Sequence, residues 1–303
     1  MTHDSKTIHV IGGPTASGKS AHALALADKY DGVIVNADSM QIYDGLPILT
    51  AQPPPEDLAQ APHKLYGHLH PNDACSAGNW NEIVKPLITE IIADNKMPII
   101  VGGSGLYINA LLYGLSPIPD IPDEVRTANN ERFERLGNDA YFAELEALDP
   151  IMASRLHRDH TARIIRAREV IDHTGKSLSV WQDLPRESPP DDWQFDVTLV
   201  IPPRETLYNR CNQRFEWMLD NGALEELEAF IVKRNKGEIS ETALLNNALG
   251  VKPLSAYLCG EMDKETAITR GQGETRRYAK RQTTWFNHQI KENKNVAKIT
   301  ILS

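Results

Sequence analysis

GGPTASGKSAHALALADKY, residues 12–30, is the stretch that most directly indicates the fold. The apolar run at residues 8–11 precedes it and is typical of a buried strand, whereas the alanine- and leucine-rich run after Lys19 favours a helix. Residues 13–20 match the spacing G-x-x-x-x-G-K-S. A strand, a glycine-rich loop and a helix in this order predict a phosphate-binding loop.

Each residue type in this loop has a physical use. Glycines let backbone N–H groups turn toward an anion, and the helix that follows adds the positive end of its dipole. Lys19 supplies a mobile positive charge, and the hydroxyl of Ser20 is a suitable ligand for Mg²⁺. An ordinary glycine-rich turn is the alternative interpretation. The residues expected to hold the phosphates are Gly13, Pro14, Thr15, Ala16, Ser17, Gly18, Lys19 and Ser20.

Length and composition indicate a globular protein with one large domain, or one domain with an insertion. The chain has 303 residues, of which 41% are hydrophobic and 24% charged. Its three cysteines, Cys75, Cys211 and Cys259, are too far apart for a zinc motif or a disulfide framework, which fits a reducing, cytoplasmic compartment. Residues 1–10 lack the basic and apolar regions of a secretion signal, and no apolar run reaches membrane-spanning length.

The charge distribution leaves room for a polyanionic partner. The net charge of −9 argues against general affinity for nucleic acid. However, residues 155–168 hold five arginines against one aspartate, and residues 276–281 hold four basic residues and no acid. Such clusters can bind a polyanion locally, although solvated helix faces with internal ion pairs would have the same composition.

The first third of the chain alternates strand and helix patterns. Residues 33–35 and 97–101 are predicted strands, and residues 79–96 between them are a predicted helix. This alternation predicts a parallel sheet, which binds ligands at the carboxyl ends of its strands. Besides the phosphate loop, Asp38 and residues 102–104 follow predicted strands directly. The proline-rich run 53–62 is expected to be a loop.

A second region interrupts this pattern. Residues 116–126, rich in proline and acid, mark a hinge or boundary, and two helical patterns follow it at 131–148 and 152–175, the second capped by Gly175. A strand is predicted at 194–201, and mostly helix from Glu205 onward. The predicted fold is therefore an α/β protein: a P-loop-containing parallel sheet core flanked by helices, with a helical insertion domain and C-terminal helices. The expected parts are residues 1–117 for the first part of the core, 118–193 for the insertion and 194–303 for the remainder.

The position of Asp38 bears on which kind of phosphate-binding protein the loop belongs to. A motor ATPase or a switch GTPase needs a Mg²⁺-orienting acid at the end of another strand. The third predicted strand ends in glycines, but Asp38 follows the second, so a metal-binding or capping role stays open. Ser39, Gln41 and Tyr43 come directly after it, and this polar and aromatic cluster is suited to recognising a planar group.

Five motifs in a fixed order carry a family resemblance. They are GPTASGKS at 13–20, NADSMQIY at 36–43, VGGSGLY at 101–107, NQRFEWML at 212–219 and KRQTTWF at 280–286. Together they resemble the tRNA dimethylallyltransferases, also called tRNA isopentenyltransferases, along roughly residues 8–290. The cysteines of the zinc-finger extension found in some eukaryotic relatives are absent from the sequence, so the compact bacterial form is the more similar.

This resemblance implies a reaction and roles for site residues. The family transfers a dimethylallyl group from dimethylallyl diphosphate to N6 of the adenosine on the 3′ side of the anticodon, giving N6-isopentenyladenosine and diphosphate. Asp38 would take the proton from the amine. Lys19 and the loop amides, together with Mg²⁺ near Ser20 and the guanidinium of Arg214, would stabilise the leaving diphosphate. Ser104 matches a family position near the reaction centre.

The resemblance also implies contacts with the tRNA anticodon stem-loop. Gln41 is expected to bond a base edge, Tyr43 to pack its segment or stack, and Trp285 to belong to the core. Two departures weaken expected contacts: Ala162 replaces a polar residue, and residues 246–252 lack the family's basic residue and tyrosine. Arg276 and Arg277 would meet phosphates. The expected tRNA-binding residues are Asp38, Ser39, Met40, Gln41, Ser104, Arg126, Ala162, Arg163, Ile164, Ile165, Arg166, Lys280 and Arg281.

Three other functions remain open at this point. The loop also permits a small-molecule kinase that uses ATP, or an adenylate isopentenyltransferase that acts on a free nucleotide. A protein that binds RNA and only senses a phosphate is the third. The arginines of the predicted insertion favour an RNA substrate over a free nucleotide. We expect a monomer without a membrane partner.

Overall fold

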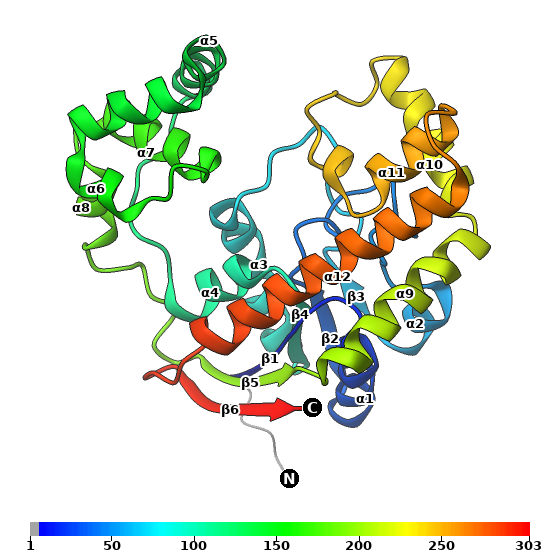
Figure 1. The fold of residues 1–303 in the computed structure, drawn as a ribbon. Coiled ribbons are helices and arrows are strands. Elements are labelled where there is room, and N and C mark those ends of the chain that lie inside the picture. Colours follow the sequence, from blue (N-terminus) through cyan, green and yellow to red (C-terminus); the bar gives the residue numbers. More distant parts are fainter. Residues whose placement is uncertain (1–5) are drawn as a thin grey trace. The chain divides into compact units, whose positions relative to one another are not determined.

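The central feature of the protein is a parallel sheet, seen here in a computed structural model that describes residues 6–303 (Figure 1). Within these residues the sheet has six strands in the order β3-β2-β4-β1-β5-β6, and neighbouring strands all pair in parallel. The strands are β1 (Thr7–Gly12), β2 (Gly32–Asn36), β3 (His63–Lys64), β4 (Met97–Gly102), β5 (Gln194–Val200) and β6 (Val296–Leu302). The stretch 1–10, which was not expected to be a secretion signal, lies partly outside the described residues.

The central strands form because they are apolar on both faces. Every residue of β2 and β4 is buried, as is typical of strands covered by helices on both sides. The strands predicted at 33–35, 97–101 and 194–201 are confirmed as β2, β4 and β5. Their order places the carboxyl ends of β2, β4 and β1 side by side, so the segments that follow these strands meet at one edge of the sheet.

In the first part of the chain and at its end, the run 53–62 and β6 differ from the sequence prediction. β6 was expected to be part of a helical region, but it pairs with β5 at the edge of the sheet. Lys298 and Thr300 interrupt its apolar residues, so it has no continuous apolar run for a pattern to detect, and four of its seven residues are exposed. The run 53–62 was expected to be a loop, but it contains a short helix, α2 (Pro55–Gln60). Proline in its first turn and the acids Glu56 and Asp57 are typical of a helix start.

The chain divides into two compact units, each described by itself. The first comprises the chain up to Leu112 and again from Pro189, and the second is Tyr113–Ser188. In the first unit, helix α12 lies beside α9 and α11 (Figure 1). Its helices are α1 (Lys19–Tyr30), α2, α3 (Ala77–Ala93), α4 (Gly105–Tyr113), α9 (Arg204–Asp220), α10 (Ala223–Asn235), η1 (Leu244–Asn247), α11 (Val251–Leu258) and α12 (Lys264–Gln289).

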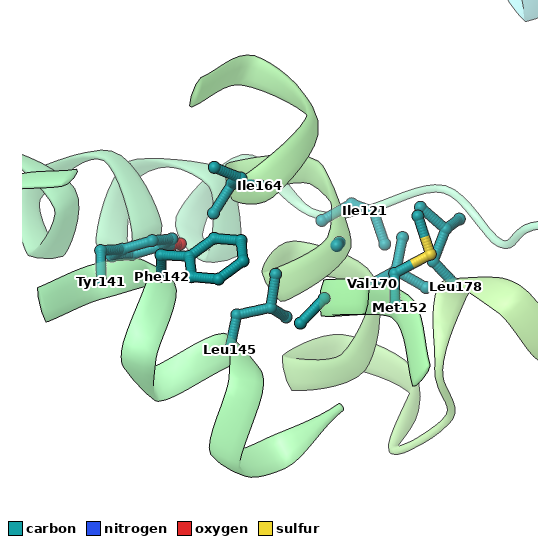
Figure 2. Packing of buried hydrophobic residues seen from close by; sticks show 10 residues of the cluster. Ile121, Tyr141, Phe142, Leu145, Met152, Ile164, Val170 and Leu178 are labelled. Atoms are coloured by element: carbon teal, nitrogen blue, oxygen red, sulfur yellow. The ribbon is translucent and has the colours of Figure 1, made fainter. Parts of the chain in front are cut away.

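The second unit is helical and has its own core. Figure 2 shows Tyr141, Phe142 and Leu145 of one helix packed near Ile164 and Val170 of another. The unit begins and ends a few residues before the expected limits 118–193, where an isolated bridge joins Leu115 to Glu187. Its helices are α5 (Asp123–Leu148), α6 (Pro150–Arg155), α7 (Thr161–Thr174) and α8 (Leu178–Gln182).

The helical pattern at 152–175 is two helices rather than the single one predicted. Leu156 has the extended φ and ψ angles of −106° and 137°, so α6 ends at Arg155 and α7 begins only at Thr161. The predicted cap is confirmed, since Gly175 ends α7 in the left-handed conformation at φ 68°. None of the helices among the described residues is long and apolar enough to cross a membrane.

Candidate active site

The loop between β1 and α1 is shaped to receive an anion. Gly13 has φ 154°, and a Cβ there would overlap the carbonyl oxygen of Val200, so only glycine fits. Gly18, at φ 99°, begins α1 without a capping side chain, and the first turn of α1 carries no acid. The first N–H groups of α1 are therefore open to an anion, as the sequence motif predicts.

Lys19 and Ser17 place further polar groups in the loop. The Lys19 ammonium donates to the carbonyl oxygen of Pro14 at 2.7 Å, so it lies across the loop. Burial, and then repulsion from Arg214, lowers the pKa of Lys19 from 10.5 to about 7, against an opposing attraction from Asp38. The hydroxyl of Ser17 is buried and has no hydrogen-bond partner in the described structure. The loop therefore holds cationic and polar groups that an anionic ligand would satisfy.

Asp38 stands on a tightly held backbone after β2. Asn36 is fully buried, accepts from the Asp38 N–H at 2.8 Å and donates to the carbonyl oxygens of Asp38 and Leu65, each at 3.0 Å. The indole of Trp80 donates to the carbonyl oxygen of Asn36. The Asp38 carboxylate accepts from the Met40 N–H at 3.0 Å and forms no salt bridge within residues 6–303. This half-buried carboxylate is oriented by its own segment and is not neutralised by a fixed cation.

The loop after β4 is joined to the Asp38 segment. A Cβ on Gly102 would overlap the carbonyl oxygen of Ala37, so the two backbones meet where only glycine fits. The Ser104 hydroxyl accepts from the Ser39 N–H at 2.8 Å and donates to the Ser39 hydroxyl at 3.1 Å. The structure thus brings Ser104 to the residue next to Asp38, and its hydroxyl holds that segment in place.

Helix α9 contributes two arginines to the phosphate loop. Arg214 donates to the hydroxyl of Thr15 at 3.4 Å, and burial lowers the pKa of its guanidinium. Arg210, one helical turn earlier, donates to the carbonyl oxygen of Ser17 at 3.1 Å. Sequence analysis missed Arg210. Its spacing of four residues from Arg214 was the available signal, because residues four apart lie on one helix face.

A cavity of about 200 Å³ connects these groups. Thr15, Asp38 and Arg214 all line it, and Leu49, Phe215, Met218 and Leu249 add apolar surface. A second, more open hollow of about 500 Å³ is lined by Ser39, Ser104 and Trp285. Tyr278 and Arg281 of α12 line both. The phosphate loop, a carboxylate and an apolar surface therefore line one cavity.

The residues present also fit a divalent cation. Ser20 lies in the first exposed turn of α1, and its hydroxyl has no hydrogen bond among the described residues. A hydroxyl is a hard oxygen ligand of the kind Mg²⁺ takes, and Mg²⁺ in proteins is usually bound by one or two side chains together with substrate phosphates and water. Ser20 is therefore suited to bind a cation that a diphosphate brings with it.

The structure narrows the expectations for Gln41 and Tyr43 and corrects the one for Trp285. The Gln41 amide nitrogen donates to the carbonyl oxygens of Thr50 and Ala51, so only its carbonyl oxygen is left for a base edge. Tyr43 is 1% exposed and therefore packs its segment; it is too buried to stack on a base. Trp285 was expected in the core, but it is half-buried, lines the open hollow and covers Gly105, where a Cβ would overlap its ring.

The expected RNA contacts lie in both units. In the first unit, Lys280 and Arg281 are exposed on α12, and Arg281 lies over the Tyr278 ring. In the second unit, Arg126, Ala162 and Arg163 are exposed on α5 and α7.

Two residues of the second unit's basic cluster differ from the expectation. Ile164 is fully buried in the core, so its side chain cannot reach a ligand. Arg168, also buried, pairs with Asp172 at 2.7 Å and Glu144 at 3.2 Å. The basic cluster at 155–168 is therefore partly structural, because one of its arginines serves an internal ion-pair network.

Comparison with known proteins gives a consistent result. The family model described as IPP transferase matches residues 41–289. The tRNA dimethylallyltransferase of Paramagnetospirillum magneticum is 43% identical over 96% of this chain and 90% of its own length. That of Nitrobacter hamburgensis is 45% identical over 93% of this chain and 88% of its own length.

Solved structures agree with these relatives. The tRNA isopentenylpyrophosphate transferase of Bacillus halodurans superposes with a TM-score of 0.66 and 31% identity, covering 98% of this chain and 89% of that one. A eukaryotic dimethylallyltransferase acting on tRNA superposes with a TM-score of 0.81 and 25% identity, covering 97% of this chain and 74% of that one.

Proposed function

Because the chain belongs to the IPP transferase family, we propose that it is a tRNA dimethylallyltransferase. It transfers the dimethylallyl group of dimethylallyl diphosphate to N6 of the adenosine on the 3′ side of the anticodon, and releases diphosphate. The observation that carries this assignment is the single cavity lined by Thr15 of the phosphate loop, Asp38 and Arg214. A leaving-group site and a proton acceptor border the same cavity.

The residues in and beside this cavity form two groups with separate roles in the reaction. The first group acts where the bond between C1 and the diphosphate oxygen breaks and negative charge grows on the leaving group. The N–H groups at the start of α1, the Lys19 ammonium and the Arg214 guanidinium stabilise that charge. Mg²⁺ at Ser20 would neutralise part of the same charge.

The second group acts where N6 of the adenine forms its bond to C1. Its lone pair is delocalised into the ring, so the amine is a weak nucleophile until a proton leaves it. The carboxylate of Asp38 accepts that proton. An adenine within an RNA loop must leave its stack to reach this carboxylate, and we propose that it enters through the open hollow beside Ser39 and Ser104.

A direct assay tests the function. The protein is incubated with Mg²⁺, dimethylallyl diphosphate and an unmodified tRNA that carries adenosines beside the anticodon, and the nucleosides are analysed by mass spectrometry. Prenylated adenosine in the tRNA is expected, with little or none on free AMP. A parallel reaction with ATP in place of the allylic diphosphate tests whether the protein is a kinase instead. Absence of prenylated adenosine with a competent tRNA would disprove the assignment.

Pyrophosphate binding is expected to take up a proton at Lys19. Its pKa of about 7 leaves most of the amine neutral at pH 8 and charged at pH 6. The bound anion favours the ammonium form, so uptake rises with pH to roughly one proton at pH 8, against about a tenth at pH 6. Calorimetry in buffers of different ionisation enthalpy measures it. The proton uptake measured with the Lys19→Met variant is subtracted, which removes the contribution from the titration of pyrophosphate itself. Equal proton uptake by both proteins would contradict the prediction.

Two arginines of α7 are expected to behave differently when replaced. Arg163 is exposed and has no ion pair among the described residues. Arg163→Ala is expected to weaken binding of the anticodon stem-loop a few-fold and to reduce the salt slope by about one, without changing stability. Arg168→Met removes a buried partner of Asp172 and Glu144, so it is expected to cost about 3 kcal/mol of stability.

Fluorescence anisotropy at several salt concentrations and thermal unfolding separate the two effects. The salt slope of folded Arg168→Met should equal that of the unaltered protein. Equal salt slopes for Arg163→Ala and the unaltered protein would remove Arg163 from the RNA surface.

A further inference from the structure

Gln282 joins two loops of the site through one side chain. It lies on α12, is 6% exposed, and uses both ends of its carboxamide. Its oxygen accepts from the Thr15 N–H at 2.8 Å, and its nitrogen donates to the carbonyl oxygen of Gly103 at 2.9 Å. Thr15 follows β1 and Gly103 follows β4, so the side chain spans the carboxyl ends of two neighbouring strands.

Gln282 packs closely against the backbone of Gly103. A Cβ on Gly103 would overlap its amide nitrogen and would lie 3.3 Å from a carboxylate oxygen of Asp38. The residue after Gly103 is Ser104, whose hydroxyl holds Ser39 beside Asp38. A continuous set of contacts therefore runs from Gln282 to the segment that carries the proton acceptor.

At its other end, Gln282 orients the phosphate loop. Side chains of two helices hold Thr15. Gln282 of α12 accepts a hydrogen bond from the Thr15 N–H, and Arg214 of α9 donates one to the Thr15 hydroxyl. A backbone N–H committed to Gln282 is not free to bind phosphate. The bond therefore orients the loop, while the open N–H groups at the start of α1 remain for the anion.

We propose that Gln282 is a positioning residue that fixes the phosphate loop and the Asp38 segment at the separation the reaction needs. This rests on the proposed function and adds a residue to it. In group transfer, the reacting atoms must be held within a narrow range, and a displacement of about 1 Å can cost roughly 10²-fold in rate. Gln282 also lines the open hollow, but both ends of its carboxamide are bonded to the backbone of Thr15 and Gly103, so we expect its effect to pass through these two residues.

Two variants separate the two bonds. Gln282→Met keeps the length of the side chain and loses both bonds. Gln282→Glu keeps the acceptor for Thr15, but its carboxylate cannot donate to Gly103. Gln272→Met is the matched control, because Gln272 lies on the same helix and bonds α9 at Asn212 and Glu216, away from both loops.

We expect a fall in kcat without a matching change in KM. Gln282→Met should lower kcat about 30- to 100-fold, and Gln282→Glu about 10-fold or more, with KM for dimethylallyl diphosphate changed less than about threefold. Gln272→Met should change neither. Hydrogen exchange at the Thr15 amide, followed by NMR, should become faster in Gln282→Met and stay slow in Gln282→Glu, because only the latter keeps the acceptor.

The outcomes are decisive in both directions. If the unaltered protein is active and Gln282→Met keeps its kcat within about twofold, the positioning role is wrong. The positioning role is also wrong if kcat falls and KM rises together, in proportion to the loss of stability. Should Gln282→Met fail to fold, the kcat and KM of Gln282→Glu decide by the same criterion. Failure of the proposed function itself is recognised separately, since the unaltered protein would then make no product while the Thr15 exchange still reports the bond.

Discussion

Replacing Asp38 by asparagine is expected to lower the rate of transfer about 10²- to 10⁴-fold. The amide keeps the shape of the side chain, and its oxygen can still accept from the Met40 N–H that orients the carboxylate. Asn36 holds the backbone of residue 38 independently of the side chain, so the fold should be retained. What the variant loses is the proton acceptor. Single-turnover rates on tRNA, with binding of the same tRNA measured in parallel, check this expectation.

Asp44→Asn is the matched control for that variant. Asp44 lies on the same segment and accepts from the next backbone N–H, that of Gly45, at 2.8 Å, but it is exposed and does not line the cavity. Its replacement should leave the rate unchanged. Full activity of Asp38→Asn would exclude Asp38 as the base, and an equal loss of tRNA affinity and rate would assign it to substrate binding instead.

Replacing Lys19 by methionine is expected to reduce kcat/KM about 10²- to 10³-fold. The ammonium of Lys19 lies across the phosphate loop and is placed where charge develops on the leaving diphosphate. Methionine retains the apolar stem and removes the charge. Loss of the positive charge should lower the affinity for pyrophosphate, measured as a competitive inhibitor, by a smaller factor than it lowers kcat. The reason is that the charge on the leaving group grows in the transition state.

Lys29→Met, near the other end of α1, provides the control. Lys29 is exposed and lies over the ring of Tyr30 at 4.6 Å, away from the loop. It should leave kcat/KM unchanged. If Lys19→Met loses pyrophosphate affinity and kcat/KM by the same factor, Lys19 contributes only to binding; unchanged kinetics would remove it from the site.

The local parts of the site could be predicted from the sequence. The phosphate loop is a run of consecutive residues whose glycines, lysine and helix start act through backbone geometry a few residues away. Asp38 and residues 102–104 were candidates because each follows a strand, and parallel strands bring their carboxyl ends to one edge. The order of the motifs indicated the family that the comparisons then showed.

The contacts that turn these parts into one site were decided by the tertiary structure. Arg210 reaches the loop from a position 193 residues away, and Gln282 from 267 residues away. The spacing of Arg210 and Arg214 places both on one helix face, but nothing in the sequence shows which loop that face meets. Burial also differs from what the composition suggests. Arg168 and Ile164 belong to a basic stretch, yet both side chains are buried in the interior of the second unit. The backbone geometry of a loop or a helix start depends on residues that are neighbours in the sequence. The partner that a side chain meets across the fold depends on how whole helices pack against the sheet.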